Sequence, residues 1–365
     1  CLLLLAPCSL LLAPCSLPLA PCSLPLAPAF AIILQFIIYE NDVAVARQPH
    51  FCVMNYSIFI APEILLPDVD MDNIGPAPDP LLLRAEMDAL KTTRCILKTP
   101  PYILIACSLK DNPALRLELG RQREITFRKV GESTGLPYDI DSFDEYYEQL
   151  IIWDDVAQRL VGGYRFGGGD KIFAAYGRQG FYINSFFDID PAFDTYFPQC
   201  LELGRSFIVE EYQKKNLPLY LLWKGIMAYM IRHPQYKYLI GPVSISRYYS
   251  DFSRKVLMEY AKRHFFHATF AKWFAPKTPF NPTLSLPAKQ EIDEWENSSL
   301  DFESILDQLQ PEHIQFPVLM KQYIRQNARF LGFNLDPNFN NALDGLMILD
   351  IADVPPVTIE MLQRA

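Results

Sequence analysis

Residues 200–232, CLELGRSFIVEEYQKKNLPLYLLWKGIMAYMIR, contain the pattern that decides the fold. Residues 201–209 are apolar and often β-branched, apart from Glu202, Arg205 and Ser206, and this composition predicts a strand. The second half is almost wholly apolar over about fifteen residues, which is too long for a strand and short for a membrane span. The stretch therefore predicts a strand, a short polar loop and a buried helix.

The expected helix has a recognisable start. Asn216 can cap it, and Pro218 fits its first turn. His233 and Pro234 end the apolar run, because the residue before a proline disfavours helix. A helix that starts after a strand aims free N–H groups at an anion, so this loop is a candidate binding site for one.

Two charges interrupt the strand. Glu202 and Arg205 are three residues apart, so the alternation of a strand predicts that their side chains point to opposite faces. Burying an unpaired charge is costly, so this pair is expected to have partners or a function.

The composition of the 365-residue chain limits the possible classes of protein. Its net charge of -9 argues against a general nucleic-acid binder. Four cysteines belong to one N-terminal repeat and the others are scattered without a paired framework, which is typical of a reducing compartment such as the cytoplasm.

The first residues form a separate region. Residues 1–28 repeat the unit LAPCSLP, and its prolines argue against both a coiled coil and a membrane helix. We interpret residues 1–53 as a low-complexity leader, translated from a tandem repeat ahead of a true start near Met54; a membrane anchor is the alternative. Deleting this leader is expected to leave a folded and active protein. Residues 54–94, rich in proline and acid, are expected to form an extended arm, and residues 95–355 the folded domain.

Further elements follow from periodicity. Residues 102–108 predict a strand, and residues 112–130 a helix whose buried face carries Leu115, Leu119, Arg123 and Phe127. The segments LIIWDD and RLVGGYRF predict a hairpin. Residues 181–189, 330–335 and 346–350 predict strands, and residues 250–260, 287–313 and 317–328 predict helices. The expected architecture is α+β, with a mixed, mostly antiparallel sheet and helices on both faces.

Two glycine segments call for separate interpretations. Gly241-Pro242 interrupts the predicted strand 236–246, so a bulge or a splayed neighbour is expected there. Residues 167–169 are three glycines that lack the features of a phosphate-binding loop, and we interpret them as a hairpin turn.

Charge is concentrated in one segment. Residues 213–280 contain twelve Lys and Arg against two acids, a balance of 12 − 2 = +10. Such a patch suits an acidic protein partner or an anionic membrane surface, whereas an ordinary solvated helix face is the alternative.

Other chemistries lack support in the sequence. There is no G-x-S-x-G motif, so Ser206 is not predicted to be a hydrolase nucleophile. His264 and His267 have no third ligand nearby in the sequence, so no metal site is predicted.

Six segments carry a resemblance to a known family: GRQREITFRKVGESTG, YDIDSFDEYY, IIWDDVAQRLVGGYRF, LELGRSFIVEEYQKKNLPLYLLWKGI, YLIGPVSIS and FNLDPNFNNALDGL. Over residues 119–350 the chain resembles the GNAT-like N-acyltransferases of aminolipid synthesis, which acylate ornithine or glycine from acyl carrier protein and are often labelled hemolysins. The pattern is also similar to that of acyl-homoserine-lactone synthases. The resemblance implies a GNAT-like (acyl-CoA N-acyltransferase) fold.

The resemblance also implies an active site. The charged cluster of the family falls on Arg123 with Phe127, Asp141 with Asp144, Arg165, and Glu202 with Arg205. Glu202 is the predicted general base, and the other charged residues are predicted to orient it and bind the acceptor. An ion-pair network that only braces the fold is the alternative. Further substrate-binding candidates are Phe127, Trp153, Ser206, Phe207, Gly241, Ser244, Lys214 and Lys215.

The loop before the apolar helix departs from the acetyl-CoA-dependent pattern. It contains no glycine, and Pro218 has no N–H to donate to a pyrophosphate. With the basic patch, this favours acyl carrier protein as the donor, through its phosphopantetheine arm, and no tightly bound cofactor. The implied reaction moves a 3-hydroxy fatty acyl group onto ornithine, glycine or another amino acid. A peripheral contact with the inner face of an anionic membrane is a further expectation.

Three alternatives remain open at this point: a signal synthase that acylates S-adenosylmethionine, a secreted membrane-active hemolysin, and a non-catalytic scaffold.

Overall fold

The structure is a computed structural model that describes residues 71–213, 215–285, 290, 292–294 and 318–363. The predicted leader 1–53, the first part of the predicted arm, Lys214 and most of the predicted helix 287–313 lie outside the described residues.

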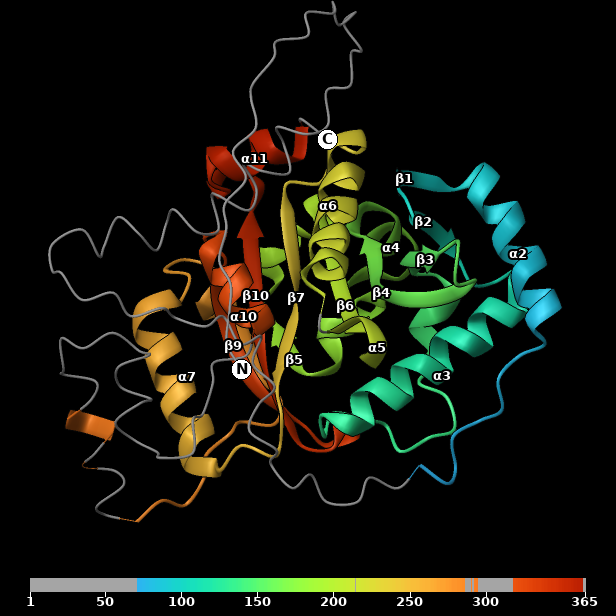
Figure 1. Cartoon of the computed structure of the whole chain (residues 1–365). Helices are drawn as coiled ribbons and strands as arrows, with labels where there is room; N and C mark the ends of the chain where they lie inside the picture. Colours follow the sequence, from blue (N-terminus) through green and yellow to red (C-terminus); the bar gives the residue numbers. More distant parts are fainter. Residues whose placement is uncertain (1–70, 214, 286–289, 291, 295–317, 364–365) are drawn as a thin grey trace, which may run out of the picture. The chain divides into compact units, whose positions relative to one another are not determined.

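An eight-stranded sheet organises the described residues, in the order β1-β2-β3-β4-β6-β7-β10-β9 (Figure 1). Neighbouring strands are antiparallel except β6 and β7, which are parallel. The bounds are β1 Cys95–Thr99, β2 Tyr102–Ser108, β3 Glu148–Asp154, β4 Arg159–Gly168, β6 Cys200–Ile208, β7 Tyr238–Ile245, β9 Arg329–Asp336 and β10 Ala342–Asp350. Two short strands, β5 (Phe187–Ile189) and β8 (Phe274–Pro276), pair with each other. The predicted mixed, mostly antiparallel sheet is confirmed.

Helices cover both faces of this sheet. Their bounds are α2 Pro80–Thr93, α3 Pro113–Lys129, α4 Gly169–Tyr176, α5 Glu210–Gln213, α6 Asn216–Arg232, α7 Asp251–Phe265, α10 Val318–Arg325 and α11 Pro356–Gln363. Gly225 of α6 approaches Leu104 and Leu150, whereas Leu119 of α3 approaches Gly163. Leu150 and Gly163 belong to opposite faces, since Leu150 pairs with Tyr164, the neighbour of Gly163. The sheet therefore separates α6 from α3.

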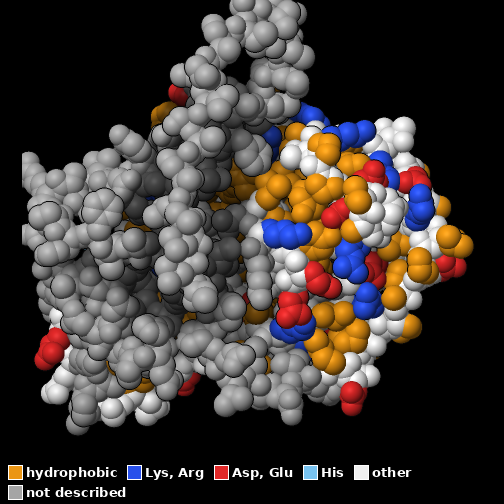
Figure 2. Space-filling model, in the orientation of Figure 1, with side chains coloured by type: hydrophobic (Ala, Val, Ile, Leu, Met, Phe, Trp, Pro, Cys, Tyr) orange, Lys and Arg blue, Asp and Glu red, His pale blue; other side chains and the backbone are white. Residues whose placement is uncertain are grey.

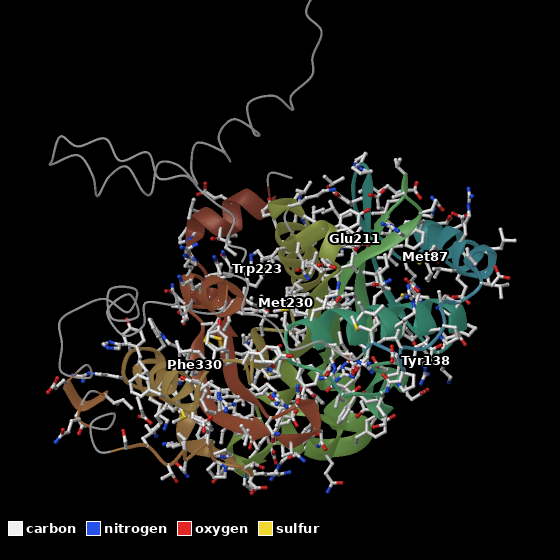
Figure 3. The ribbon with its side chains drawn as sticks, turned by 60° about the horizontal axis from the view of Figure 1, so that its bottom comes forward. Met87, Tyr138, Glu211, Trp223, Met230 and Phe330 are labelled. Atoms are coloured by element: carbon white, nitrogen blue, oxygen red, sulfur yellow. The ribbon has the colours of Figure 1, made fainter. Side chains whose placement is uncertain are left out.

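Helix α6 forms as the apolar run predicted, and it packs with α10 on one side. Tyr229 of α6 contacts Phe166 edge-on, and Trp223 of α6 contacts Tyr323 of α10 in the same way. Figure 3 shows Trp223 and Met230 on this helix. The helix cap was predicted one residue late, because Lys215 occupies the N-cap position and Asn216 is the first helical residue.

The pairing of β4 with β6 contains a bulge at the centre of the sheet. Gly163 pairs with Phe207 and Arg165 with Gly204, so Arg205 and Ser206 both oppose a single residue of β4. Arg205 has φ +51°, a left-handed conformation that non-glycine residues seldom adopt. The bulge interrupts the alternation of the strand, and it turns Arg205 toward the face that carries Glu202. The prediction of opposite faces is therefore wrong.

Strands β6 and β7 separate along their length. Their ladder runs from Cys200–Tyr238 to Glu202–Ile240 and stops there. Beyond this point β6 pairs only with β4, and β7 only with β10. The separation begins next to Gly241-Pro242, which confirms the predicted splay.

Several expectations for other segments need correction. The predicted hairpin turn at the three glycines is wrong, because Gly167 and Gly168 end β4 and Gly169 begins α4. Pro80–Thr93 forms α2 rather than an extended arm, with the Asp79 side chain accepting from Leu81 N. In the predicted strand 181–189 only Phe187–Ile189 is extended, and Tyr182–Ser185 is a 3-10 turn.

Within the described ranges, no helix is both long enough and apolar enough to cross a membrane.

Candidate active site

Three buried side chains from three elements form the centre of the charged cluster. Arg123 of α3 donates from Nη1 to Asp144 Oδ1 over 3.0 Å and from Nη2 to Gln149 Oε1 over 2.5 Å. Arg165 of β4 donates from Nη1 to Asp144 Oδ2 over 3.3 Å and to Asp141 Oδ1 over 2.6 Å. Arg123 and Asp144 are fully buried and Arg165 is 1% exposed. The predicted cluster is thus brought together, with Asp144 bridging two guanidinium groups.

The charges in this centre stabilise one another. Burial alone would raise the pKa of Asp144, but Arg123 and Arg165 outweigh it and hold that pKa well below its usual range. Burial opposes the charge on Arg165, yet Asp144 and Asp141 raise its pKa further. Breaking such a buried pair by removing one partner strongly destabilises a protein, so these residues also hold the fold.

Arg205 of β6 connects the cluster to the loop after α3 and to the 3-10 turn that begins at Tyr182. Its guanidinium pairs with Asp139 over 2.9 Å and with Asp141 over 3.6 Å, and Nη1 donates to the Tyr182 hydroxyl over 2.6 Å. The Arg165 and Arg205 guanidinium carbons lie 4.8 Å and 5.0 Å from the Tyr182 ring centre. The Tyr182 ring is therefore within the range of a cation–π contact with both arginines.

Glu202 lies where the β6–β7 ladder ends, and both of its oxygens are engaged. Oε2 accepts from the Tyr147 hydroxyl and from Tyr182 N at 3.2 Å, and Oε1 accepts from Ile183 N at 2.8 Å. Burial raises the pKa of Glu202 to about 7, even though these donors and Arg165 favour its charged form. The carboxyl can therefore exchange a proton near neutral pH, but it also fixes the turn that carries Tyr182.

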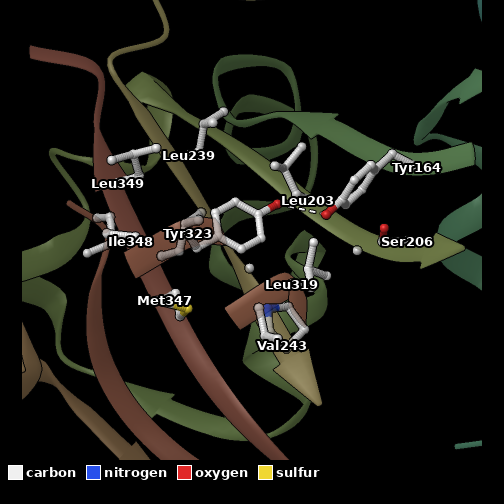
Figure 4. Close-up of a pocket in the computed structure, with 15 residues that line it drawn as sticks. Tyr164, Leu203, Ser206, Leu239, Val243, Leu319, Tyr323, Met347, Ile348 and Leu349 are labelled. Atoms are coloured by element: carbon white, nitrogen blue, oxygen red, sulfur yellow. Dashed lines mark hydrogen bonds between the residues drawn. The ribbon is translucent and has the colours of Figure 1, made fainter. Parts of the chain in front are cut away.

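A cavity of about 30 Å³ lies between β6 and β7 where they separate (Figure 4). Leu203, Gly204 and Ser206 line it from β6, and Gly241 and Pro242 from β7. On the α10 side, the Tyr164 and Tyr323 hydroxyls are hydrogen-bonded at 2.8 Å (Figure 4), and Tyr164 also bonds to Ser206. The cavity opens on the sheet face opposite the charged cluster, because Tyr164 and Arg165 alternate along β4.

Some of the other predicted binding residues lie at the charged cluster, and others lie away from it. Phe127 contacts Phe207 and Phe339 edge-on, and Phe339 lies against the Arg205 guanidinium, so these rings wall the cluster. Ser244 bonds to Asp344 rather than lining the cavity. Lys215 is exposed and lies over the ring of Tyr212.

Trp153, another predicted binding residue, lies away from the cluster. Trp153 pairs with Leu160 near the β3–β4 turn, four residues along β3 from the Gln149 that contacts Arg123. Its side chain is buried in the apolar core, and its indole N–H has no protein partner among the described residues.

Sequence reasoning left four residues of the cluster unassigned: Asp139, Tyr147, Gln149 and Tyr182. Asp139 stands in the same acidic run as Asp141 and Asp144, so the run itself was a usable signal. Tyr147 reaches Glu202 with its hydroxyl from the bend before β3, and Tyr182 donates its backbone N–H from a 3-10 turn. Neither position has a periodic pattern that marks its partner.

Comparisons with known proteins provide separate evidence on the class of this protein. Residues 122–223 match the family model of the acetyltransferase (GNAT) domain, and this range contains the six predicted catalytic residues. The chain has a GNAT fold. Together with relatives named N-acyltransferase, this GNAT match supports an acyltransferase enzyme.

Two relatives carry the name glycine N(alpha)-acyltransferase. The protein from Bacteroides thetaiotaomicron is 36% identical over 195 residues, which are 50% of this chain and 58% of that protein. The protein from Phocaeicola vulgatus is 26% identical over 286 residues, 75% of this chain and 87% of that protein. The match with the first thus spans less than two thirds of its length.

A solved structure, the CoA-dependent acyl-homoserine lactone synthase BjaI with MTA, is also similar, at 14% identity. The match covers 72% of this chain and 88% of that one, with a TM-score of 0.32.

Proposed function

We propose that the chain is an N-acyltransferase that moves a fatty acyl group from a thioester to the α-amine of glycine. The observation that carries the proposal is the position of the charged cluster, on one face of the sheet where β6 and β7 separate. A cavity lies on the other face of the same gap. A thioester entering through the gap would meet an amino acid held by the cluster. The relatives named for glycine favour that acceptor over ornithine.

The proposed chemistry is direct aminolysis. The acceptor ammonium gives one proton to a carboxylate, and the free amine attacks the thioester carbonyl carbon. The carbon–nitrogen bond forms, the carbon–sulfur bond breaks, and a second proton passes from nitrogen to the departing thiolate. Backbone N–H groups on the unpaired strand edges are the proposed donors to the oxyanion. Glu202 is the proton acceptor that the sequence predicts.

We propose acyl carrier protein as the donor. Only one short helix, α5, separates β6 from Lys215 and α6, and the first turn of α6 contains Pro218, which has no N–H for a pyrophosphate. The basic segment is less concentrated than its count indicates, since Arg254 pairs with Asp251 and Lys255 with Glu259. On the face in Figure 2, basic side chains likewise lie among acidic ones. The glycine-free loop therefore supports acyl carrier protein as the donor more strongly than the basic segment does.

Lipid analysis tests the function in cells. Cells that express the full chain should gain N-acylglycines, measured by mass spectrometry, whereas cells that express Arg165→Ala should not. Gain of an ornithine lipid or an acylated homoserine lactone instead would assign a different acceptor. No new acylated amine in any extract, with the protein folded and present, would contradict the proposal.

A further inference from the structure

Another carboxylate, separate from the charged cluster, lies on the same face as Glu202, on the far side of the gap. Ser244 of β7 and Asp344 of β10 are paired in register, and Ser244 Oγ donates to Asp344 Oδ1 over 2.7 Å. Ile240, which pairs with Glu202, is four residues before Ser244 and therefore shares its face. Asp344 is 3% exposed. The hydroxyl and the carboxylate thus face the side of the sheet that carries the charged cluster.

The Asp344 carboxylate lacks a cation of its own. No ion pair involves it within the described parts of the chain, and Ser244 provides its one side-chain hydrogen bond there. Arg205 attracts it, but that guanidinium is already paired with Asp139 and Asp141. Burial, together with the neighbouring Asp336, raises the pKa of Asp344 to about 7. A cationic ligand would compensate this buried charge.

Arg165, next to Tyr182, provides a matching donor. Arg165 Nη2 is buried and has no hydrogen-bond partner among the described residues, and the guanidinium lies 4.8 Å from the Tyr182 ring centre. Asp344 and Asp336 act electrostatically on the same tyrosine. The face therefore holds an uncompensated carboxylate and an unused guanidinium N–H, the two groups that an amino-acid zwitterion requires.

We propose that Asp344, positioned by Ser244, binds the α-ammonium of the acceptor and takes its first proton. This inference rests on the proposed function. The ammonium nitrogen loses one proton to the Asp344 carboxylate, bonds to the thioester carbon as the carbon–sulfur bond breaks, and gives a second proton to the departing thiolate. One N–H remains in the amide. Glu202, with three donors already on its oxygens, holds the turn that carries Tyr182.

Equilibrium binding of glycine and of glycolate tests the inference without any acyl donor. Glycolate keeps the carboxylate and replaces the ammonium by a hydroxyl. The full chain should bind glycine more tightly than glycolate. Asp344→Asn keeps an acceptor for Ser244 but removes the charge, so it should weaken glycine binding by at least roughly 30-fold and leave glycolate binding unchanged. Ser244→Ala should weaken glycine binding by several-fold.

Asp336→Asn is the matched control. Asp336 is buried on the same β9–β10 hairpin, but its side chain accepts from the N–H groups of Asn338 and Phe339 and so caps the turn. Because Asp336 also raises the pKa of Asp344, the comparison is made well above pH 7, where Asp344 is charged with or without Asp336. There this variant should keep the wild-type ratio of glycine to glycolate affinity. An equal loss for both ligands in Asp344→Asn, or no preference for glycine in the wild type, would overturn the inference.

Single-turnover assays separate this inference from the function. If the wild type acylates glycine and Asp344→Asn does so with the same rate and KM, Asp344 does not bind the ammonium, but the proposed function stands. If the wild type binds glycine through Asp344 but forms no amide, the proposed function is wrong, but the binding site stands.

Discussion

At the level of single residues, Glu202 is an acid whose two oxygens are both engaged. Tyr147, Tyr182 and Ile183 all donate to it, so its side chain braces the turn after α4 as well as carrying a titratable proton. The Glu202→Gln variant would place an NH₂ group opposite backbone N–H donors.

We expect Glu202→Gln to lower stability by about 1–3 kcal/mol, because a buried donor loses its acceptor. The folded fraction should keep a single-turnover rate within about tenfold of the wild type. Melting temperature and single-turnover rate measured on one sample check this. A stable variant whose rate falls by roughly 100-fold or more would return the role of general base to Glu202, as the sequence predicts.

Asp344 makes stability depend on pH. Its pKa is raised from 3.8 to about 7 in the folded state, so the folded protein retains a proton that the unfolded chain releases between these values. This contribution is present at low pH and is lost as pH rises through about 7. Asp344→Asn carries no such proton. Its stability relative to the wild type should therefore increase from about pH 5 to about pH 8, measured as urea midpoints. A difference in urea midpoint between the two proteins that does not change with pH would contradict the raised pKa of Asp344.

The residues of the cluster were partly predictable. Arg123 and Phe127 follow from a four-residue helical spacing, and Glu202 stands out as a charge on an apolar strand. That Arg205 shares the face of Glu202 did not follow, because the residue with φ +51° is an arginine, and the neighbouring Gly204 alone does not say which residue bulges. Asp344 was missed because its partner Ser244 is one hundred residues away in the sequence.

At the scale of elements, the separation of β6 and β7 positions the site. Gly241-Pro242 marked this separation in the sequence, since a proline inside a strand removes a ladder donor. The three glycines at the end of β4, in contrast, led to the wrong prediction of a hairpin turn. A Cβ on Gly169 would lie 1.9 Å from the carbonyl oxygen of Phe197, so this glycine permits close packing of α4 rather than a turn.

Gly241→Ala should disturb the point where the strands separate. An added Cβ would lie 2.1 Å from the Leu203 carbonyl oxygen, and this backbone atom cannot move aside cheaply. We expect a loss of about 1–3 kcal/mol or more in the free energy of unfolding, as for other overpacked sites. Gly204→Ala is the control, because nothing lies within 4 Å of its added Cβ. Equal urea midpoints for the two variants would show that the close approach does not hold the strands.

At the scale of the whole molecule, the alternation of strands and helices was largely predictable because its segments are strongly periodic. The sheet order was not, since β10 pairs with β7, a strand about one hundred residues earlier in the sequence. The choice of acyl donor also depends on the whole molecule, because a carrier protein would bind to a surface of the enzyme rather than to one side chain.

We expect acyl carrier protein to be a better donor than the same acyl group on CoA. The loop between β6 and α6 offers no glycine-rich cradle for a pyrophosphate, whereas exposed lysines such as Lys215 can meet an acidic carrier. The preference should weaken as salt is added, because exposed charges are screened. Initial rates with both donors at low and high salt measure this. Equal rates at low salt would argue for CoA as an equivalent donor.

The most direct measurement is the product formed by the purified full chain from glycine and an acyl-loaded carrier protein, detected by mass spectrometry. We predict an N-acylglycine from the wild type, with at least roughly 100-fold less from Asp344→Asn under the same conditions, in line with the loss of a general base. Thioester hydrolysis without amide formation, or an acylated product from other amines but not from glycine, would contradict it.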